Sequence, residues 1–164
     1  MSGNLAVILM GSKADYDHGK KITSWLDHFG IAHETHIASA HKTPEKLLAI
    51  LSANEKRGLN IVYVGIAGLS NALSGMVEFS TAFPVVSCPP PNDAFGGADV
   101  FSSLRMPPGV AAATVLDPRN AAIFAAKIFA LGDPALASKI RAYQKEQRDK
   151  IDTDDADIQR LYGA

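Results

Sequence analysis

An α/β fold, with helices on both faces of a parallel sheet of about five strands, is predicted from two observations. Short apolar runs of strand character alternate with longer segments of helical period, as in βα units that feed a parallel sheet. The first run, residues 5–10, is almost continuously apolar, which is typical of strands covered on both faces. The sequence therefore predicts a three-layer sandwich.

The first helix and the second strand come next along the chain. Residues 15–29 are predicted to form an amphipathic helix that Gly30 closes. Its apolar positions lie at spacings of three and four, at Ile22, Trp25, Leu26 and Phe29. Residues 31–38 alternate between apolar and polar, which predicts a strand near an edge of the sheet because of its polar content.

The middle of the chain predicts a second helix, a third strand and a third helix. Thr43 is placed as an N-cap with Pro44 at the first helical position, and this helix ends at Gly58. Its expected buried side carries Leu47, Leu48 and Leu51. Residues 60–68 predict a strand that runs into a small-residue turn, and residues 70–80 predict a further helix.

The next part of the chain predicts two strands and a helix. Residues 83–91 predict a fourth strand, which is interrupted by prolines that cannot continue a central ladder. Residues 109–115 predict a fifth strand. Asp117 and Pro118 then start a helix whose apolar composition over residues 121–131 predicts burial on several sides.

The C-terminal helix and tail, residues 133–164, open at Asp133 and Pro134 and end in an acidic, thinly apolar stretch. We expect this end to fray or to pack on a neighbouring subunit, because it has no core of its own. Strand followed by helix five times, with right-handed crossovers, predicts a flavodoxin-like sandwich. We expect a single domain over residues 1–164, with its core at about residues 4–140.

Composition narrows the class of protein. A length of 164 residues with 47% hydrophobic content suffices for one real core, and the net charge of −1 includes no block of like charges. We therefore expect no nucleic-acid partner and no membrane partner. The apolar run near the N-terminus is too short for a signal peptide or a membrane span, so a cytoplasmic location is expected. Cys88 is the only cysteine, which makes a disulfide framework or a zinc site improbable.

Four unusual loops follow the first four predicted strands. They are GSKAD, SAHKTP, GIAGLSN and SCPPPNDAFGG. Ligands of doubly wound sheets bind beyond the carboxyl ends of the strands, so these loops are expected to gather around one crevice.

The first loop can bind an anion at the start of a helix, where backbone N–H groups have no partner within the helix. Ser12 adds a hydroxyl, and Asp15 is placed to bind sugar hydroxyls. An ordinary helix cap is an equally good interpretation. The loop matches neither GxGxxG nor a Walker A motif, so a dinucleotide or ATP site is not supported.

The second loop places a hydroxyl, an imidazole and a cation together before another helix. At such a position the helix dipole favours a neutral His41, which suits general acid/base work. An exposed loop histidine is the ordinary alternative. The other histidines are interpreted as surface or structural groups, and they are His18, His28, His33 and His36.

The third and fourth loops carry weaker signals. The small residues of GIAGLSN let the backbone approach a planar ligand, although tight packing of helix on sheet explains the glycines equally well. Ser70 and Asn71 can equally be N-caps. Cys88 is interpreted as filling a strand end, with no base beside it in the sequence.

Taken together, these loops are specific. MGSKAD, SAHKTP, GIAGLSNAL, PVVSCPPP and DVFSSLRMPPGVAAATVLDP, in this order, resemble the phosphoribosylaminoimidazole carboxylase family of purine biosynthesis over residues 4–140. One branch of that family is a mutase that moves a carboxylate from N5 to C4 of aminoimidazole ribonucleotide (AIR), and it has a histidine in its third loop. This chain has none there. It is more similar to the branch that adds CO2 directly to AIR, without ATP, biotin, metal or other cofactor.

The resemblance also implies roles for individual residues. His41 is the implied general acid/base at C4. Lys42 stands where the mutase branch has arginine, which keeps the charge but loses bidentate phosphate geometry. The implied substrate-binding residues are Gly11, Ser12, Asp15, Ser39, Ala40, Lys42, Gly65, Ala67, Gly68, Ser70 and Asn71.

Other readings of the same residues stay open. Family members of this type are homo-octamers in which the C-terminal helix packs on a neighbour, so the resemblance implies the same here. The alternatives are an N5-carboxyaminoimidazole ribonucleotide mutase that uses the same site, and a flavodoxin-like module without enzymatic activity that binds a nucleotide or a protein. In either enzymatic case the partners are small-molecule substrates, namely AIR with CO2, or N5-carboxy-AIR.

Overall fold

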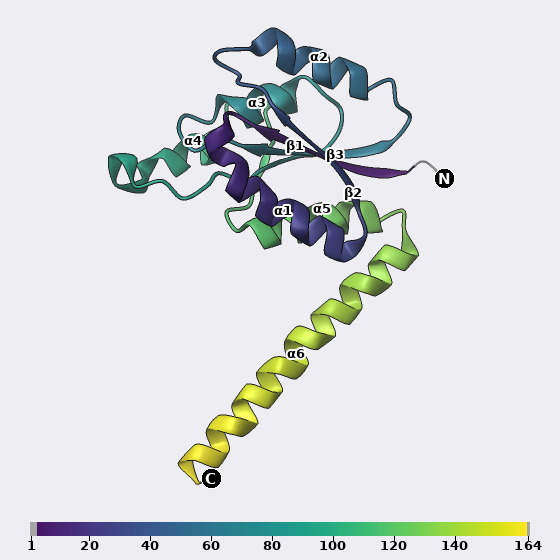
Figure 1. The fold of residues 1–164 in the computed structure, drawn as a ribbon, viewed down its shortest axis with the longest axis vertical. Helices are drawn as coiled ribbons and strands as arrows, with labels where there is room; N and C mark the ends of the chain where they lie inside the picture. The colour runs from purple at the N-terminus through teal and green to yellow at the C-terminus, as the bar shows by residue number, and fades with distance from the viewer. Residues whose placement is uncertain (1–2, 164) are drawn as a thin grey trace.

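A five-stranded parallel sheet organises the computed structural model of the chain, which describes residues 3–163 (Figure 1). Every pair of neighbouring strands is parallel, in the order β2-β1-β3-β4-β5. The strands are β1 (Asn4–Met10), β2 (Ala32–Ile37), β3 (Asn60–Ile66), β4 (Val85–Ser87) and β5 (Ala113–Thr114). The predicted fold class and the position of the second strand at an edge are both confirmed.

Helices cover both faces of this sheet, as Figure 1 shows. On one face lie α1 (Tyr16–Phe29) and α5 (Pro118–Ala130), and on the other lie α2 (Pro44–Asn54) and α3 (Ala72–Phe79). The alternation of β1 serves both layers. Its even-numbered side chains, such as Ile8, join the core under α1 and α5, while its odd-numbered ones join the core under α2 and α3. This two-sided burial explains why the first strand is apolar throughout.

Several predicted helix ends are confirmed. Gly30 has a φ of 72° and closes α1 in the left-handed conformation, which only glycine adopts at little cost. Asp117 caps α5 by accepting a hydrogen bond from the Asn120 N–H at 2.9 Å. Asp133 caps the last helix in the same way, from the Leu136 N–H at 3.0 Å.

The second helix differs from its prediction in three respects. It ends at Asn54, before Gly58. Leu48 is 43% exposed, so its predicted burial is wrong: Leu47 and Leu51 form the buried stripe, and Leu48 lies about 100° around the helix from Leu47. Thr43 occupies the N-cap position, but its hydroxyl makes no cap bond to the helix.

The region after β4 departs further from expectation. The predicted fifth strand over residues 109–115 is reduced to the two residues of β5, and β3 ends at Ile66. The intervening chain forms a short 3-10 segment, η2 (Ala94–Val100), and α4 (Phe101–Leu104), neither of which was predicted. The burial of α5 on several sides is also wrong. Only one face of this helix is buried, and Phe124 on the opposite side is 39% exposed.

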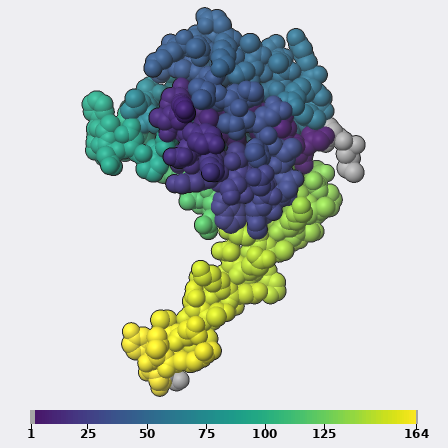
Figure 2. All heavy atoms as spheres, in the orientation of Figure 1, coloured from purple at the N-terminus to yellow at the C-terminus, as the bar shows by residue number. Residues whose placement is uncertain are grey.

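The last helix, α6 (Pro134–Tyr162), continues without a break through the acidic end of the chain. Leu136 and Ile140 anchor its first turns in the core, whereas every described residue after Gln144 is exposed. Figures 1 and 2 show the second half projecting away from the sandwich. Within a single chain this end is therefore helical and uncovered. None of the described helices is both long and apolar enough to cross a membrane.

Candidate active site

One cavity of about 540 Å³ lies beyond the carboxyl ends of β1, β2 and β3. All but two of the predicted site residues line it, the exceptions being Gly65 and Asn71. The residues that do are Gly11, Ser12, Asp15, Ser39, Ala40, His41, Lys42, Ala67, Gly68 and Ser70. Ala14, Leu69, Leu73, Pro90, Pro91 and Asn92 complete the lining. The four loops thus meet at one place, as expected for a doubly wound sheet.

The first loop is held by a reciprocal cap. The Ser12 N–H donates to Asp15 Oδ2 at 2.9 Å, and Ser12 Oγ accepts from the Ala14 N–H at 3.2 Å. The interpretation of these residues as a helix cap is therefore confirmed. Asp15 is buried, with 7% of its surface exposed, yet it borders the cavity. The cap fixes a carboxylate in the floor of the cavity while the Ser12 hydroxyl stays at its rim.

The second loop is a closed turn with His41 at its apex. Ser39 O accepts from the Thr43 N–H at 2.8 Å, and Thr43 Oγ1 accepts from the Ser39 N–H at 2.9 Å. Ser39 Oγ accepts from the Lys42 N–H at 3.3 Å. His41 and Lys42 are exposed at the cavity, and among the described residues neither side chain has a hydrogen-bond partner. The turn is rigid, and its imidazole and ammonium are available to a ligand.

The third loop is shaped by two close approaches. A Cβ added at Gly65 would lie 2.5 Å from Ser74 Oγ, so the helix α3 packs directly on the strand there. A Cβ added at Gly68 would lie 3.1 Å from Pro90 Cγ. The interpretation of the Gly65 position as tight packing of helix on sheet is confirmed. At Gly68 the proline loop takes the space that a side chain would need.

Asn71 is the last residue of the third loop and does not line the cavity. It is 3% exposed and caps α3, since its Oδ1 accepts from the Ser74 N–H at 3.1 Å. Its Nδ2 donates to Ser87 Oγ at 2.6 Å and to Ser103 Oγ at 2.8 Å. The N-cap interpretation of this residue is confirmed, and its amide is fully engaged inside the protein.

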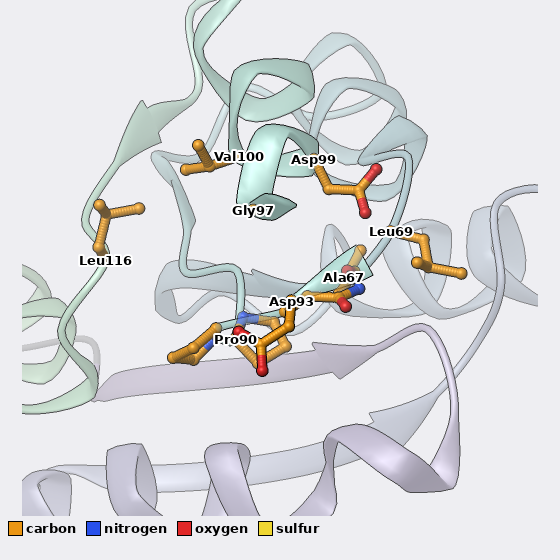
Figure 3. Close-up of a pocket in the computed structure, with 11 residues that line it drawn as sticks. Ala67, Leu69, Pro90, Asp93, Gly97, Asp99, Val100 and Leu116 are labelled. Carbon is orange, nitrogen blue, oxygen red and sulfur yellow. Dashed lines mark hydrogen bonds between the residues drawn. The ribbon is translucent and has the colours of Figure 1, made fainter. Parts of the chain in front are cut away.

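A second cavity, of about 320 Å³, adjoins the first and was missed by the sequence reasoning. The two cavities share the segments 67–69 and 90–92 in their linings. Figure 3 shows Val100 and Leu116 on one side of the second cavity and Asp99 with Leu69 on another. The only sequence signal for this cavity is the proline run followed by the glycine pair Gly96 and Gly97. In the structure both glycines have positive φ angles, and the chain folds back there.

Behind the site, His18 and Cys88 form a buried pair, with His18 Nε2 3.4 Å from Cys88 Sγ. Burial raises the pKa of the Cys88 thiol to about 12, with a smaller contribution from Asp117. A thiol in this state is a poor nucleophile, which agrees with the interpretation that Cys88 fills a strand end. Residues 3–163 contain no group of three or more His, Cys, Asp or Glu side chains that could hold a metal ion.

The buried His18 predicts a pH dependence of stability. Burial, followed by the charge of Lys21, lowers the pKa of His18 from 6.5, against smaller opposing effects of Asp15, Asp117 and the Cys88 contact. Below pH 6.5 the unfolded chain therefore binds a proton that the folded chain does not. We expect His18 to lower the free energy of unfolding as pH falls, by up to about 1.4 kcal/mol per pH unit.

Urea unfolding of His18→Asn between pH 7.5 and 5.5 measures this effect, because the variant loses the titrating group. His28 is exposed and forms no ion pair among the described residues, so His28→Asn provides a matched control. Equal pH slopes for the wild type and His18→Asn would contradict the assignment.

Comparison with known proteins identifies the family of the chain. A family model described as AIR carboxylase matches residues 5–150. The phosphoribosylaminoimidazole carboxylase of Archaeoglobus fulgidus is 53% identical over 91% of this chain and 82% of its own length. That of Treponema denticola is 46% identical over 95% of this chain and 98% of its own length. A human bifunctional phosphoribosylaminoimidazole carboxylase/phosphoribosylaminoimidazole succinocarboxamide synthetase is 45% identical over 83% of this chain, which spans 32% of that protein.

A solved structure supports the same assignment. The crystal structure of Treponema denticola PurE matches with a TM-score of 0.92 at 45% identity, covering 94% of this chain and 98% of that one. The chain belongs to the AIR carboxylase family, whose members are enzymes of purine biosynthesis.

Proposed function

We propose that this enzyme carboxylates AIR directly at C4 with CO2, giving 4-carboxy-AIR, and that the reaction is reversible. The proposal rests on one observation. His41, Lys42, Ser12 and Asp15 line the same cavity, and the His41 side chain has no hydrogen-bond partner among the described residues. These side chains supply a proton acceptor, a cation, a hydroxyl and a carboxylate, which suit a phosphorylated ribose that bears a basic heterocycle. We also propose that the enzyme acts in the cytoplasm.

The carboxylation of AIR by CO2 can proceed with these side chains alone. AIR is electron-rich at C4, so the ring carbon attacks the carbon of CO2, and one C–O π bond of CO2 becomes the carboxylate. The ring intermediate still carries the C4 proton. His41 accepts that proton, and the C–H electron pair restores the aromatic ring. In the reverse direction the same imidazole protonates C4 and CO2 leaves.

The remaining side chains position the substrate. Lys42 and the hydroxyls of Ser12 and Ser39 are at the rim of the cavity, where they can bind the 5-phosphate. Asp15 can accept hydrogen bonds from ribose hydroxyls. Ala67 and Gly68 offer a flat backbone surface for the imidazole ring, and the neighbouring prolines keep that part of the cavity apolar, which favours CO2 over water.

The third loop favours direct carboxylation over the mutase reaction. The mutase branch has a histidine in this loop, and here there is none. The structure gives a physical reason why a histidine would not fit readily at Gly65 or Gly68. A side chain at Gly65 would collide with Ser74, and one at Gly68 would press on Pro90. This loop therefore supplies no imidazole for a reaction at N5, whereas direct addition of CO2 needs none.

A substrate comparison tests the proposal. One sample of the purified enzyme receives AIR with bicarbonate and CO2 in the absence of ATP, and a parallel sample receives N5-carboxy-AIR. The formation of 4-carboxy-AIR is followed in both. We expect rapid product from AIR and little enzymatic acceleration from N5-carboxy-AIR. The reverse result would make the enzyme a mutase, and no turnover of either compound would favour a binding module.

We further propose that the chain assembles into a homo-octamer through its uncovered apolar side chains. Three large apolar side chains have high exposed fractions. They are Phe95 (87%) on the arm formed by residues 94–104, Leu131 (89%) after α5, and Leu161 (78%) on α6. Exposed apolar side chains at several separate places are typical of subunit interfaces. Light scattering of the intact chain is expected to give a mass near eight chains, and a monomer would refute the proposal.

A truncation tests the part that α6 plays in this assembly. A chain that ends at Gln144 retains the anchors Leu136 and Ile140 but loses the exposed half of the helix. We expect it to unfold at nearly the same urea concentration when both are measured as isolated chains, and to assemble less than the full chain. An unchanged number of subunits by light scattering would show that the half of α6 after Gln144 takes no part in the interface.

A further inference from the structure

We infer that Asn71 is a positioning residue, which holds the third loop of the active site by tying it to Ser87 and Ser103. The inference rests on the proposed function, since it concerns how the same cavity is kept in shape. It departs from the role that the family resemblance implies for Asn71, which is contact with the substrate.

The first argument is burial. Asn71, Ser87 and Ser103 are 3%, 0% and 2% exposed, and Asn71 is absent from the cavity lining. Both amide hydrogens of Asn71 are donated to the two serine hydroxyls, at 2.6 and 2.8 Å. An amide that is committed in this way has no donor left for a ligand.

The second argument is that the third loop is held by hydrogen bonds from segments distant in sequence. Residues 67–70 are Ala, Gly, Leu and Ser, and Leu69 is 60% exposed. The hydrogen bonds that do reach the loop come from the segment around the second cavity. Asn92 Nδ2 donates to Gly68 O at 2.5 Å, and Ser102 Oγ accepts from the Asn71 N–H at 2.9 Å. The loop is thus held by residues that lie 24 and 31 positions further along the chain than their partners in the loop.

The third argument is that Ser103 is itself fixed. Its carbonyl accepts from Thr114 Oγ1 at 2.9 Å, which ties α4 to β5 independently of Asn71. Ser87 is the last residue of β4. Asn71 therefore links the loop directly to β4 and to α4, which is itself bonded to β5. Because a displacement of about 1 Å in a site can cost about a hundredfold in rate, this link matters for the alignment of Gly68 and Ala67 with His41.

The test uses Ser103→Ala, which removes a partner of Asn71 without touching the cavity. Ser74→Ala is the matched control. Ser74 has the same residue type, is also fully buried beside Asn71, and its hydroxyl has no partner among the described residues. We expect Ser103→Ala to lower kcat by about ten- to a hundredfold with a smaller change in KM. Ser74→Ala should leave both unchanged.

A double variant and a second measurement complete the test. Asn71→Ala combined with Ser103→Ala should be no slower than Asn71→Ala alone, because both remove the same link. Hydrogen exchange of the amides in residues 67–71 should accelerate in Ser103→Ala but not in Ser74→Ala. Ser103→Ala with wild-type kcat and wild-type exchange would overturn the inference, as would a loss confined to Asn71→Ala, which would indicate direct contact with substrate.

The two proposals can fail separately. If the wild type converts neither AIR nor N5-carboxy-AIR, the proposed function falls, while the exchange comparison still decides whether Asn71 positions the loop. If the wild type is active and the exchange comparison shows no difference, the proposed function stands and the positioning role falls.

Discussion

Replacing His41 with asparagine is expected to reduce turnover of AIR by a hundredfold to ten-thousandfold, the usual range for loss of a general acid/base. The imidazole lies at the apex of a closed turn, is exposed to the cavity and has no side-chain partner among the described residues. Asparagine keeps the polarity but cannot take up the C4 proton. Initial rates of 4-carboxy-AIR formation at saturating AIR and CO2 measure the effect.

The fold of the His41→Asn variant should be intact, because the turn is held by Ser39 and Thr43 and not by the imidazole. Circular dichroism and light scattering check this point. His28→Asn is a suitable control, since His28 is exposed on α1 and packs near Trp25, away from the cavity lining. Full turnover by a well-folded His41→Asn protein would show that His41 is not the general acid/base.

The second large effect is a loss of stability, which we expect when Gly65 is replaced by alanine. A Cβ at this position would lie 2.5 Å from Ser74 Oγ and 3.4 Å from Ser74 Cα, in a fully buried contact between β3 and α3. Overpacking of this kind costs about 1–3 kcal/mol. We expect Gly65→Ala to lower the midpoint of urea unfolding accordingly, and to lower activity because the third loop begins at this residue.

Two further variants show whether the collision is the cause. Adding Ser74→Ala to Gly65→Ala removes the nearest atom, so the double variant should recover part of the loss. Gly132→Ala is the control, since an added Cβ there would meet its nearest neighbour only at 4.0 Å and should change stability little. If the single variant at Gly65 were as stable as the wild type, the close packing of α3 on β3 would be disproved.

The elements that were predictable from sequence are those whose signals are local. The helix over residues 15–29 has a regular apolar spacing and a glycine at its end, and both features arise within one element. The caps at Asp117 and Asp133 are local for the same reason. The gathering of the loops followed from topology, because parallel strands bring their carboxyl ends to one edge.

The features that could not be predicted concern contacts between distant parts of the chain. Leu48 belongs to a run of apolar residues in which spacing alone does not show which side faces the sheet. The hydrogen bond from Asn71 to Ser103, on which its proposed positioning role depends, spans 32 residues and cannot be found by periodicity. The arm over residues 94–104 folds back through consecutive positive φ angles, including that of Phe95, a non-glycine residue for which no sequence rule predicts this conformation.

The uncovered half of α6 gathers its negative charge toward the carboxyl end of the chain. Basic side chains such as Lys145 and Arg148 come first, and the acidic run over residues 152–157 follows, in which like charges three positions apart repel one another. Arg160 offsets only part of this repulsion. Added salt screens such interactions, so the end of the helix in an unassembled chain should become more helical as ionic strength rises. A neighbouring subunit with basic groups would have the same effect, and α6 would then be completed by the surface on which it docks.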